Sequence, residues 1–290
     1  MRIAILGNAG SWYTNDLTRA AGERHEIVPV DYQKLASTVG GDTTVHTAEQ
    51  TLNECDALLV RSMPPGSLEQ IIFRMDALAN LAQAGVTVIN PPRAIEVAVD
   101  KYLATTRLAA AGMLVPRTIT CQTVEQALRA FDSLGGDVVL KPLFGSEGRG
   151  IVRLSDETIA IRTFKALAAV DSVFYLQEFL EHEGCDLRLL VLGDDVLGIR
   201  RCNELDWRTN ISRGATGQPL EVTNDLAELA QRAAAAIGAP LAGVDLLPTR
   251  DGRLYAIEVN AVPGWRALAE VTGVDVAARV LGYLEAHPGS

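Results

Sequence analysis

The sequence is short of aromatic residues, of basic residues and of long apolar runs. Aromatic side chains make up 5% of the 290 residues, so a core would consist mainly of Ala, Leu, Val and Ile. The formal net charge of −10 disfavours nucleic acid or an anionic membrane as the main partner, because both select for basic surfaces. No apolar run reaches the ~18 residues of a membrane-spanning helix. The start, MRIAILGNAG, is typical of a buried strand rather than a signal peptide.

Cysteine is also scarce, and none of the four cysteines lies in a C-x-x-C motif. Without that spacing we expect neither disulfide bonds nor a zinc site, and we expect free thiols in a reducing, cytoplasmic location. The cysteines are Cys55, Cys121, Cys185 and Cys202. The histidines lack a metal-ligand spacing as well and are expected at the surface; they are His25, His46, His182 and His287.

Motifs of several enzyme classes are missing. ILGNAGSW does not match G-x-G-x-x-G, so a dinucleotide-dependent oxidoreductase is only weakly supported. The glycine-rich loop near residue 146 has no G-K-[ST] and precedes a strand-like segment rather than a helix, which argues against a P-loop. Ser11 and Ser62 lack the context of a nucleophile elbow, so a serine hydrolase is not expected.

The length predicts about two domains, and the order of the predicted elements divides the chain into three units. Residues 1–93 alternate short apolar strands with helical segments, which predicts a parallel sheet with helices on its faces. Residues 94–175 begin with a broken helix pair and continue into hairpins around the glycine-rich loop. Residues 176–290 contain further hairpins and helices. The expected fold class is therefore α/β, with α+β character in the last two units.

The segment LYAIEVNAVPGW, near the C-terminus, places Ala256, Glu258 and Asn260 on one face of a predicted strand. An Asp-Gly turn at residues 251–252 predicts a hairpin that sets Asp245 opposite Glu258. Opposed carboxylates repel each other across a sheet, and a divalent cation with oxygen ligands would relieve that repulsion. The pattern indicates a Mg²⁺ site; the alternative is a solvated hairpin face with ordinary surface acids.

The segment KPLFGSEGRGIV combines a lysine with three glycines, at positions 145, 148 and 150. Glycine lets backbone amides approach an anion closely, and Lys141, at the end of a strand-like segment, can place its ammonium group on a phosphate. The pattern indicates a flap between two strands that closes over a nucleotide. The alternative is a flexible hairpin tip.

Arginines cluster around the segment IRRCNELDWRTNISRG, which is unusual in so acidic a chain. Guanidinium groups bind phosphate and carboxylate through paired hydrogen bonds, so these side chains are candidates for holding an anionic substrate. The alternative is a solvated strand whose charges pair with local acids. The residues are Arg188, Arg200, Arg201, Arg208 and Arg213.

Taken in order, these motifs resemble the ATP-grasp superfamily, and more closely its RimK-type branch of amino-acid ligases. The resemblance rests on VDKYLATTRLAAAGMLVPRT, LKPLFGSEGRGIV, YLQEFL, CDLRLLVLG, WRTNISRGA, LAGVDLL and YAIEVNAVPGW. It implies an ATP-grasp fold in which residues 1–93 form a pre-ATP-grasp, substrate-side domain. Residues 94–175 would form the small lobe with the linker and flap, and residues 176–290 the large lobe with the metal site.

The resemblance also implies a site. Its nucleotide-binding residues would be Lys101, Lys141, Ser146, Gln177, Glu178, Phe179, Leu180, Asp186, Arg208, Thr209 and Asn210. Within this set the lysines would contact phosphates, residues 177–180 would read adenine, and Asp186 would lie beside the ribose. Two Mg²⁺ ions, or Mn²⁺ in their place, would be held by Asp245, Glu258 and Asn260. The catalytic residues would be Arg201, Asn210 and Arg213, and the substrate-binding residues Arg61, Arg74, Arg188 and Arg200.

The implied reaction forms an amide bond through an acyl phosphate. A substrate carboxylate would attack the γ-phosphate of ATP, and the amine of glutamate would then displace phosphate. The flap reads FGSEGRG, where relatives that modify ribosomal proteins carry EGTQGIG, which favours a small-molecule acceptor such as a pterin-type coenzyme.

Other functions stay open at this point. The chain could be a ligase that acts on a protein C-terminus or on an amino-acid carrier, a phosphotransferase that stops at the acyl phosphate, or an ATP-binding module without chemistry. Relatives of this kind are commonly dimers or tetramers, so we expect a homo-oligomer.

Overall fold

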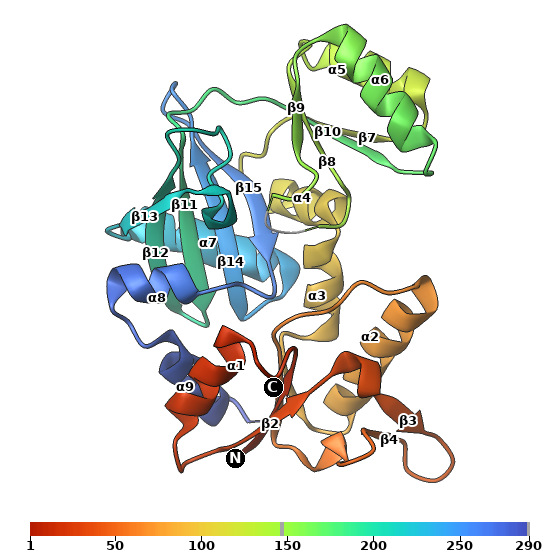
Figure 1. The fold of residues 1–290 in the computed structure, drawn as a ribbon. Coiled ribbons are helices and arrows are strands. Elements are labelled where there is room, and N and C mark those ends of the chain that lie inside the picture. The colour runs from red at the N-terminus through yellow and green to blue at the C-terminus, as the bar shows by residue number, and fades with distance from the viewer. Residues whose placement is uncertain (146–147, 289–290) are drawn as a thin grey trace.

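The computed structural model describes residues 1–145 and 148–288, and within these ranges the strands form three main sheets and one small ribbon (Figure 1). The N-terminal sheet has the order β2-β1-β5-β6 and is parallel throughout, as predicted. The elements of this unit are β1 (Arg2–Leu6), α1 (Trp12–Ala21), β2 (Glu26–Val30), η1 (Tyr32–Lys34), β3 (Ala36–Thr38), β4 (Thr44–His46), η2 (Leu52–Glu54), β5 (Ala57–Val60), α2 (Leu68–Gln83) and β6 (Thr87–Ile89).

Helices α1 and α2 cover opposite faces of the N-terminal sheet. Ile5 of β1 packs in the same core as Leu17 of α1, whereas Leu6 belongs to the core that contains α2. The chain therefore leaves the neighbouring strands β1 and β5 toward opposite faces, and such sheets bind their ligands beyond the carboxyl ends of strands at this point. Arg61 directly follows β5 and Asn90 directly follows β6, so both lie at this edge.

The middle unit is an antiparallel sheet of order β7-β10-β8-β9, covered by α5 and α6. Phe131, Phe164 and Phe174 belong to a core of its own. In Figure 1 this unit stands apart from the other two sheets, with the β8–β9 end directed toward α4. The connecting and middle elements are α3 (Pro92–Val99), α4 (Lys101–Ala110), β7 (Thr118–Cys121), α5 (Val124–Ser133), β8 (Val138–Lys141), β9 (Val152–Leu154), α6 (Glu157–Ala168) and β10 (Phe174–Glu178).

The last unit is a five-stranded antiparallel sheet of order β13-β12-β11-β14-β15. One face packs against α7, α3 and α4, and the other packs against α8, α9 and α1. The elements are β11 (Cys185–Leu192), β12 (Asp195–Cys202), η3 (Ile211–Arg213), β13 (Thr216–Pro219), α7 (Asn224–Ile237), β14 (Leu241–Pro248), β15 (Leu254–Asn260), α8 (Arg266–Thr272) and α9 (Val276–Ala286). The mixed helix and sheet content agrees with the predicted fold class, while the domain boundaries at 93 and 175 stay a prediction.

The hairpin of β14 and β15 pairs Asp245 with Glu258, as predicted, but its register changes beside that pair. Leu246 pairs with Ala256, because the connection is longer than the predicted two-residue turn and a β-bulge at Ile257 compensates for the extra residue. Ala256 consequently joins the hydrophobic core. The prediction that it shares the polar face of Glu258 is wrong.

The expectations for cysteine and histidine need correction. Cys185 and Cys202 lie directly opposite each other on β11 and β12 and form a disulfide bond. The other two cysteines are free. His25 is buried, with Nε2 2.8 Å from Oε1 of Glu285, rather than at the surface. Among the helices of the described ranges, none is long and apolar enough to cross a membrane.

Candidate active site

Charged side chains gather on one face of the five-stranded sheet because of the strand register. Asp186 lies opposite Arg201 across β11 and β12, and Arg188 lies opposite Asp245 across β11 and β14. Asp245 in turn lies opposite Glu258 of β15. Directly opposed residues share a face, so these side chains form one polar face to which the four strands β11, β12, β14 and β15 contribute.

Asp245 is buried, and arginine contacts both of its carboxylate oxygens. Arg188 Nη1 lies 2.6 Å from Oδ1, and Arg201 Nη2 lies 3.1 Å from Oδ2. Burial opposes ionisation, but the two guanidinium groups outweigh it and hold the pKa of Asp245 below its usual value. The opposed carboxylates therefore have counter-charges from the protein itself, which the sequence argument did not anticipate.

Asp186 is 1% exposed and is enclosed by donors. Arg201 donates from Nε at 2.8 Å and from Nη2 at 2.5 Å, and Thr209 Oγ1 donates at 2.6 Å. Burial raises the pKa of Asp186, and Arg201 opposes that rise. Asp186 therefore orients Arg201 and Thr209. Its place beside the ribose stays a prediction.

Glu258 and Asn260 have side-chain oxygens that no partner in residues 1–145 or 148–288 occupies. Burial and the neighbouring Asp245 raise the pKa of Glu258, while Lys101 and Lys141 act against that rise. The described part of the chain holds no group of three or more His, Cys, Asp or Glu side chains fit for a metal ion. Two carboxylates and one amide nevertheless suit Mg²⁺, which keeps several waters and binds substrate phosphates.

Two lysines face Glu258 from the base of the glycine-rich loop. Lys141 ends β8 and is half-buried; burial lowers its pKa to about 8, Glu258 opposes this shift, and Lys101 adds to it. Lys101 begins α4 and donates from Nζ to the carbonyl oxygen of Gly145 at 2.7 Å. The predicted pair of phosphate-binding lysines is thus brought to the edge of the polar face.

The glycine-rich loop contacts the segment between β12 and β13. Arg213 Nη2 donates to the carbonyl oxygen of Gly148 at 3.2 Å, and Arg208 Nη1 lies 3.5 Å from the carbonyl oxygen of Ile151. A Cβ built on Gly148, which has φ +68°, would lie 2.6 Å from Asn210 Oδ1. Arg208, expected on the nucleotide, and Arg213, expected to be catalytic, therefore bind the loop, and Asn210 packs against Gly148. The predicted Ser146 lies outside the described residues.

The segment expected to read adenine, residues 177–180, consists of the last two residues of β10 and the two residues that follow it. Its first side chain, Gln177, is buried and donates to Thr118 Oγ1 at 3.0 Å and to Tyr175 Oη at 2.9 Å. Tyr175 Oη lies 2.7 Å from Thr105 Oγ1 of α4, so a polar chain links α4 to the middle sheet. Glu178 accepts a hydrogen bond from the backbone N–H of Arg117 at 2.8 Å.

The four predicted substrate arginines separate in the structure. Arg200 pairs with Leu187, whose side chain packs toward α7, so Arg200 lies on the opposite face from Arg201 and is exposed there. The structure does not bring it to the polar face, and its substrate-binding role stays a prediction. Arg61 and Arg74 are buried, and each donates to a backbone carbonyl 2.8 Å away. Of the four, only Arg188 contacts the acids of the polar face.

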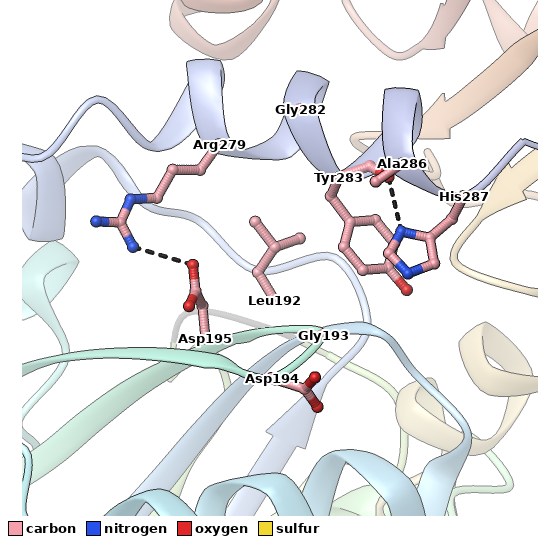
Figure 2. A pocket seen from close by; sticks show the side chains of 9 residues that line it. All are labelled: Leu192, Gly193, Asp194, Asp195, Arg279, Gly282, Tyr283, Ala286 and His287. Atoms are coloured by element: carbon pink, nitrogen blue, oxygen red, sulfur yellow. Dashed lines mark hydrogen bonds and ion pairs between the residues drawn. The ribbon is translucent and has the colours of Figure 1, made fainter.

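A separate cavity lies between the β11–β12 turn and α9. It is open to solvent and has a volume of about 470 Å³. Figure 2 shows Asp195 bound to Arg279 and the ring of His287 stacked on Tyr283, with a centroid separation of 4.1 Å. Glu258, Lys141 and the glycine-rich loop do not line it. Its size therefore does not make it the active site.

Comparison with known proteins agrees with this geometry. Residues 98–284 match the family model described as the RimK-like ATP-grasp domain. The chain belongs to the RimK-like ATP-grasp family.

Two relatives support this assignment. The tetrahydromethanopterin:alpha-L-glutamate ligase of Methanosarcina acetivorans is 34% identical over an alignment of 272 positions, which covers 84% of each chain. A ribosomal protein bS6–L-glutamate ligase of Escherichia coli is 30% identical over an alignment of 294 positions, which covers 99% of this chain and 96% of that one.

A solved structure of the ATP-grasp ligase PsnB with a minimal precursor has the same fold. It covers 98% of each chain with a TM-score of 0.79 at 22% sequence identity. The expected ATP-grasp fold and RimK-type membership are confirmed, and so is the class of ATP-dependent, amide-forming ligase. Use of ATP and Mg²⁺ in general accords with this family.

Sequence reasoning missed several residues beside the site. Asn90 and Tyr13 contact the chain that follows Asn260, Tyr13 through Trp265 within that chain, and none of the three was singled out. Asn90 had one usable signal: it is a polar residue that directly follows an apolar strand and precedes two prolines. The contacts of Tyr13 and Trp265 arise between distant parts of the RimK-like chain and have no local signature.

Proposed function

We propose that this RimK-like ATP-grasp protein joins L-glutamate to a carboxylate of a small-molecule acceptor, with a pterin-type coenzyme as the favoured acceptor class. The observation that carries the proposal is the 34% identity to a tetrahydromethanopterin:alpha-L-glutamate ligase over 84% of both chains. The unpartnered oxygens of Glu258 and Asn260 beside two lysines support it, because phosphoryl transfer needs a cation and positive side chains at one place.

The reaction is an acyl phosphate ligation. The acceptor carboxylate attacks the γ-phosphate of ATP and ADP leaves; the amine of glutamate then attacks the acyl carbon, phosphate leaves, and the ammonium proton passes to solvent or a nearby base. Mg²⁺ held by the polar face would neutralise charge on the transferring phosphoryl group. Lys101 and Lys141 would hold the phosphates from the loop side. Arg213 and Asn210 would keep the flap over the intermediate and exclude water, which hydrolyses acyl phosphates.

The residue assignments made from the resemblance stand here as proposals, with the changes that the contacts require. Asp245, Glu258 and Asn260 are proposed to hold Mg²⁺, or Mn²⁺ in its place. Arg188 already contacts Asp245 and is proposed to meet the substrate carboxylate near it. Arg201, which is bound by Asp186, is proposed to hold Asp245 in position. Residues 177–180 would offer their backbone to adenine, and a cytoplasmic homo-oligomer stays a prediction.

A protein acceptor is the second candidate. It is favoured by the 30% identity to the ribosomal protein bS6–L-glutamate ligase, which spans 99% of this chain. The flap sequence FGSEGRG favours a small-molecule acceptor, because it departs from the EGTQGIG expected of ribosomal-protein ligases.

Mass spectrometry distinguishes the two candidates. The enzyme is incubated with Mg-ATP and glutamate, once with a reduced pterin that carries a free carboxylate and once with a peptide that ends in glutamate. We expect a mass gain of one glutamyl residue on the pterin, in amounts equal to the ADP formed. Gain on the peptide alone would favour the protein ligase, and ADP without either product would contradict amide formation.

A further inference from the structure

The chain that directly follows Asn260, residues 261–265, is held by side chains of the N-terminal unit. Asn90 donates from Nδ2 to the carbonyl oxygens of Ala261 and, at 2.7 Å, of Leu241. Its Oδ1 accepts the backbone N–H of Leu241 at 3.0 Å. One buried amide, 1% exposed, thus fixes the end of β15 against the beginning of β14.

Arg61 holds the same segment two residues further on. Its Nη2 donates to the carbonyl oxygen of Pro263 at 2.8 Å, and its guanidinium carbon lies 4.0 Å from the ring centroid of Trp265. The ring of Tyr13 lies on the same guanidinium at 4.7 Å. Asp16 accepts the indole N–H of Trp265 at 3.1 Å. Arg61 and Asn90 come from neighbouring parallel strands, so the carboxyl edge of the N-terminal sheet forms the support.

Residues 261–265 are also connected to Asp245, through the packing of Pro263 beside Arg188. Gly243 lies opposite Asn260 in the sheet. A Cβ built on Gly243 would come within 2.5 Å of Arg188 Nη2 and 2.9 Å of Pro263 Cβ, so both groups pack over the bare backbone there. Because Arg188 binds Asp245, the position of Pro263 affects Asp245 as well as Asn260.

Arg61 is costly to bury. It is 7% exposed, and Nε and Nη1 have no hydrogen-bond partner among the described residues. An apolar side chain of similar length would avoid the desolvation cost of a guanidinium group. What the guanidinium provides, and an apolar side chain cannot, is the donor to Pro263 and the cation–π contacts that orient Trp265.

We propose that Arg61 and Asn90 are positioning residues for the metal site: the N-terminal sheet fixes the 261–265 segment, and thereby the ligand geometry of Asn260, Glu258 and Asp245. This inference rests on the proposed metal site. Residues that orient metal ligands from outside the coordination shell change metal affinity by about 10–100-fold when they are lost.

The test is a titration of Mn²⁺ followed by electron paramagnetic resonance, with a non-hydrolysable ATP analogue present. We expect Arg61→Met to weaken Mn²⁺ binding roughly tenfold, because it keeps the length of the side chain but loses the donor to Pro263. Arg61→Lys keeps a donor and should recover most of the affinity. Arg74→Met is the matched control: Arg74 is buried in the same unit and donates to Pro64, not to the 261–265 segment.

The outcomes distinguish failure of the proposed metal site from failure of the proposed positioning role of Arg61. Failure of the unmodified protein to bind Mn²⁺ would overturn the proposed metal site itself. Mn²⁺ binding that is equally tight in the unmodified protein and in folded Arg61→Met would overturn the positioning role alone, and so would an equal loss in Arg74→Met. Should Arg61→Met fail to fold by circular dichroism, Asp16→Ala decides the question. It removes the acceptor of Trp265, and unchanged Mn²⁺ affinity there would overturn the inference.

Discussion

Lys141 titrates near neutral pH, at a pKa of about 8, because burial disfavours its charge. Phosphates bound beside Lys141, as proposed, would stabilise the ammonium form, so we expect nucleotide binding to raise this pKa. The affinity for nucleotide is therefore highest, and independent of pH, in the range where Lys141 is already protonated in the free protein. It falls as pH rises through about 8 and continues to fall toward the higher pKa of the bound state.

This loss of nucleotide affinity with rising pH can be measured. We expect the dissociation constant of a non-hydrolysable ATP analogue to be level below pH about 7.5 and to increase by up to about tenfold per pH unit above pH about 8. Lys141→Arg should flatten the profile, because arginine keeps its charge throughout this range. Calorimetric titration at several pH values measures both. A profile in the arginine variant that matches the unmodified protein would exclude Lys141 as the titrating group.

Glu258 is a buried carboxyl group that folding makes harder to ionise. Its pKa is raised on folding, mainly by burial, so ionisation destabilises the folded state at every pH above the unfolded pKa. We expect Glu258→Gln to raise the melting temperature at neutral pH while it lowers ADP formation by at least about 100-fold, the upper range seen when the surroundings of a metal are disrupted.

Differential scanning calorimetry and an ADP assay measure the two effects of Glu258→Gln. The control is Glu204→Gln, an exposed acid outside the polar face. Full ADP formation in Glu258→Gln would remove Glu258 from the metal site.

At the scale of the elements, the contact between the glycine-rich loop and the segment between β12 and β13 requires a glycine at position 148. Gly148 has φ +68°, and a Cβ there would meet Asn210 at 2.6 Å. Gly135, in the same unit, has φ +92° with nothing within 4 Å of the added atom. Alanine at either position carries the same backbone strain, about 1–2 kcal/mol, but only at Gly148 does it also prevent closure.

We therefore expect Gly148→Ala to release more ADP than amide product, because an open flap admits water to the acyl phosphate. Gly135→Ala should keep the ratio of ADP to amide at one and lose only stability. Parallel assays of ADP and amide give the ratio. A ratio of one in Gly148→Ala would mean that the flap does not protect the intermediate.

The disulfide between β11 and β12 is a second feature at this scale. Cys185 and Cys202 are separated by 17 positions in the sequence, and closing a loop of about 15 residues contributes about 3 kcal/mol to stability in the chain-entropy account. We expect urea unfolding to show a loss of this order in Cys202→Ser or after reduction. Cys121→Ser, which alters a free thiol, should unfold like the unmodified protein. Equal stability with and without reductant would contradict the stabilising role.

The hairpin of β14 and β15 illustrates what a sequence can and cannot predict. Alternation and turn chemistry set Asp245 opposite Glu258 correctly, but only because a longer turn and the bulge at Ile257 cancel. Clustering of arginines in the sequence suggested that Arg200 and Arg201 act together, although strand alternation puts neighbours on opposite faces. The support of Pro263 by Arg61 joins positions 202 residues apart, and no local pattern encodes such a contact.

At the scale of the whole molecule, the cores do not follow the three predicted units. The N-terminal sheet and the five-stranded sheet share both of their cores: Leu58 and Val244 belong to one, Leu59 and Leu190 to the other. The middle sheet has a core of its own around Phe164. We therefore expect two cooperative unfolding units rather than three.

Calorimetry should resolve a small transition for the middle sheet and a larger one for the rest. Phe164→Ala, expected to cost about 3–5 kcal/mol, should lower the small transition only, and Leu58→Ala should lower the larger one only. A non-hydrolysable ATP analogue, bound between the units, should raise both. A single transition that both substitutions shift equally would show one cooperative unit.

The contact of Asn90 and Arg61 with residues 261–265 also constrains how such proteins can be recombined. A chimera that takes its first 93 residues from one family member and the remainder from another inherits the two halves of this contact from different parents. Such a chimera is expected to transfer substrate preference only if positions 61, 90 and 261–265 all come from the same parent. A shuffled library selected for activity should therefore be enriched in matched combinations of these positions.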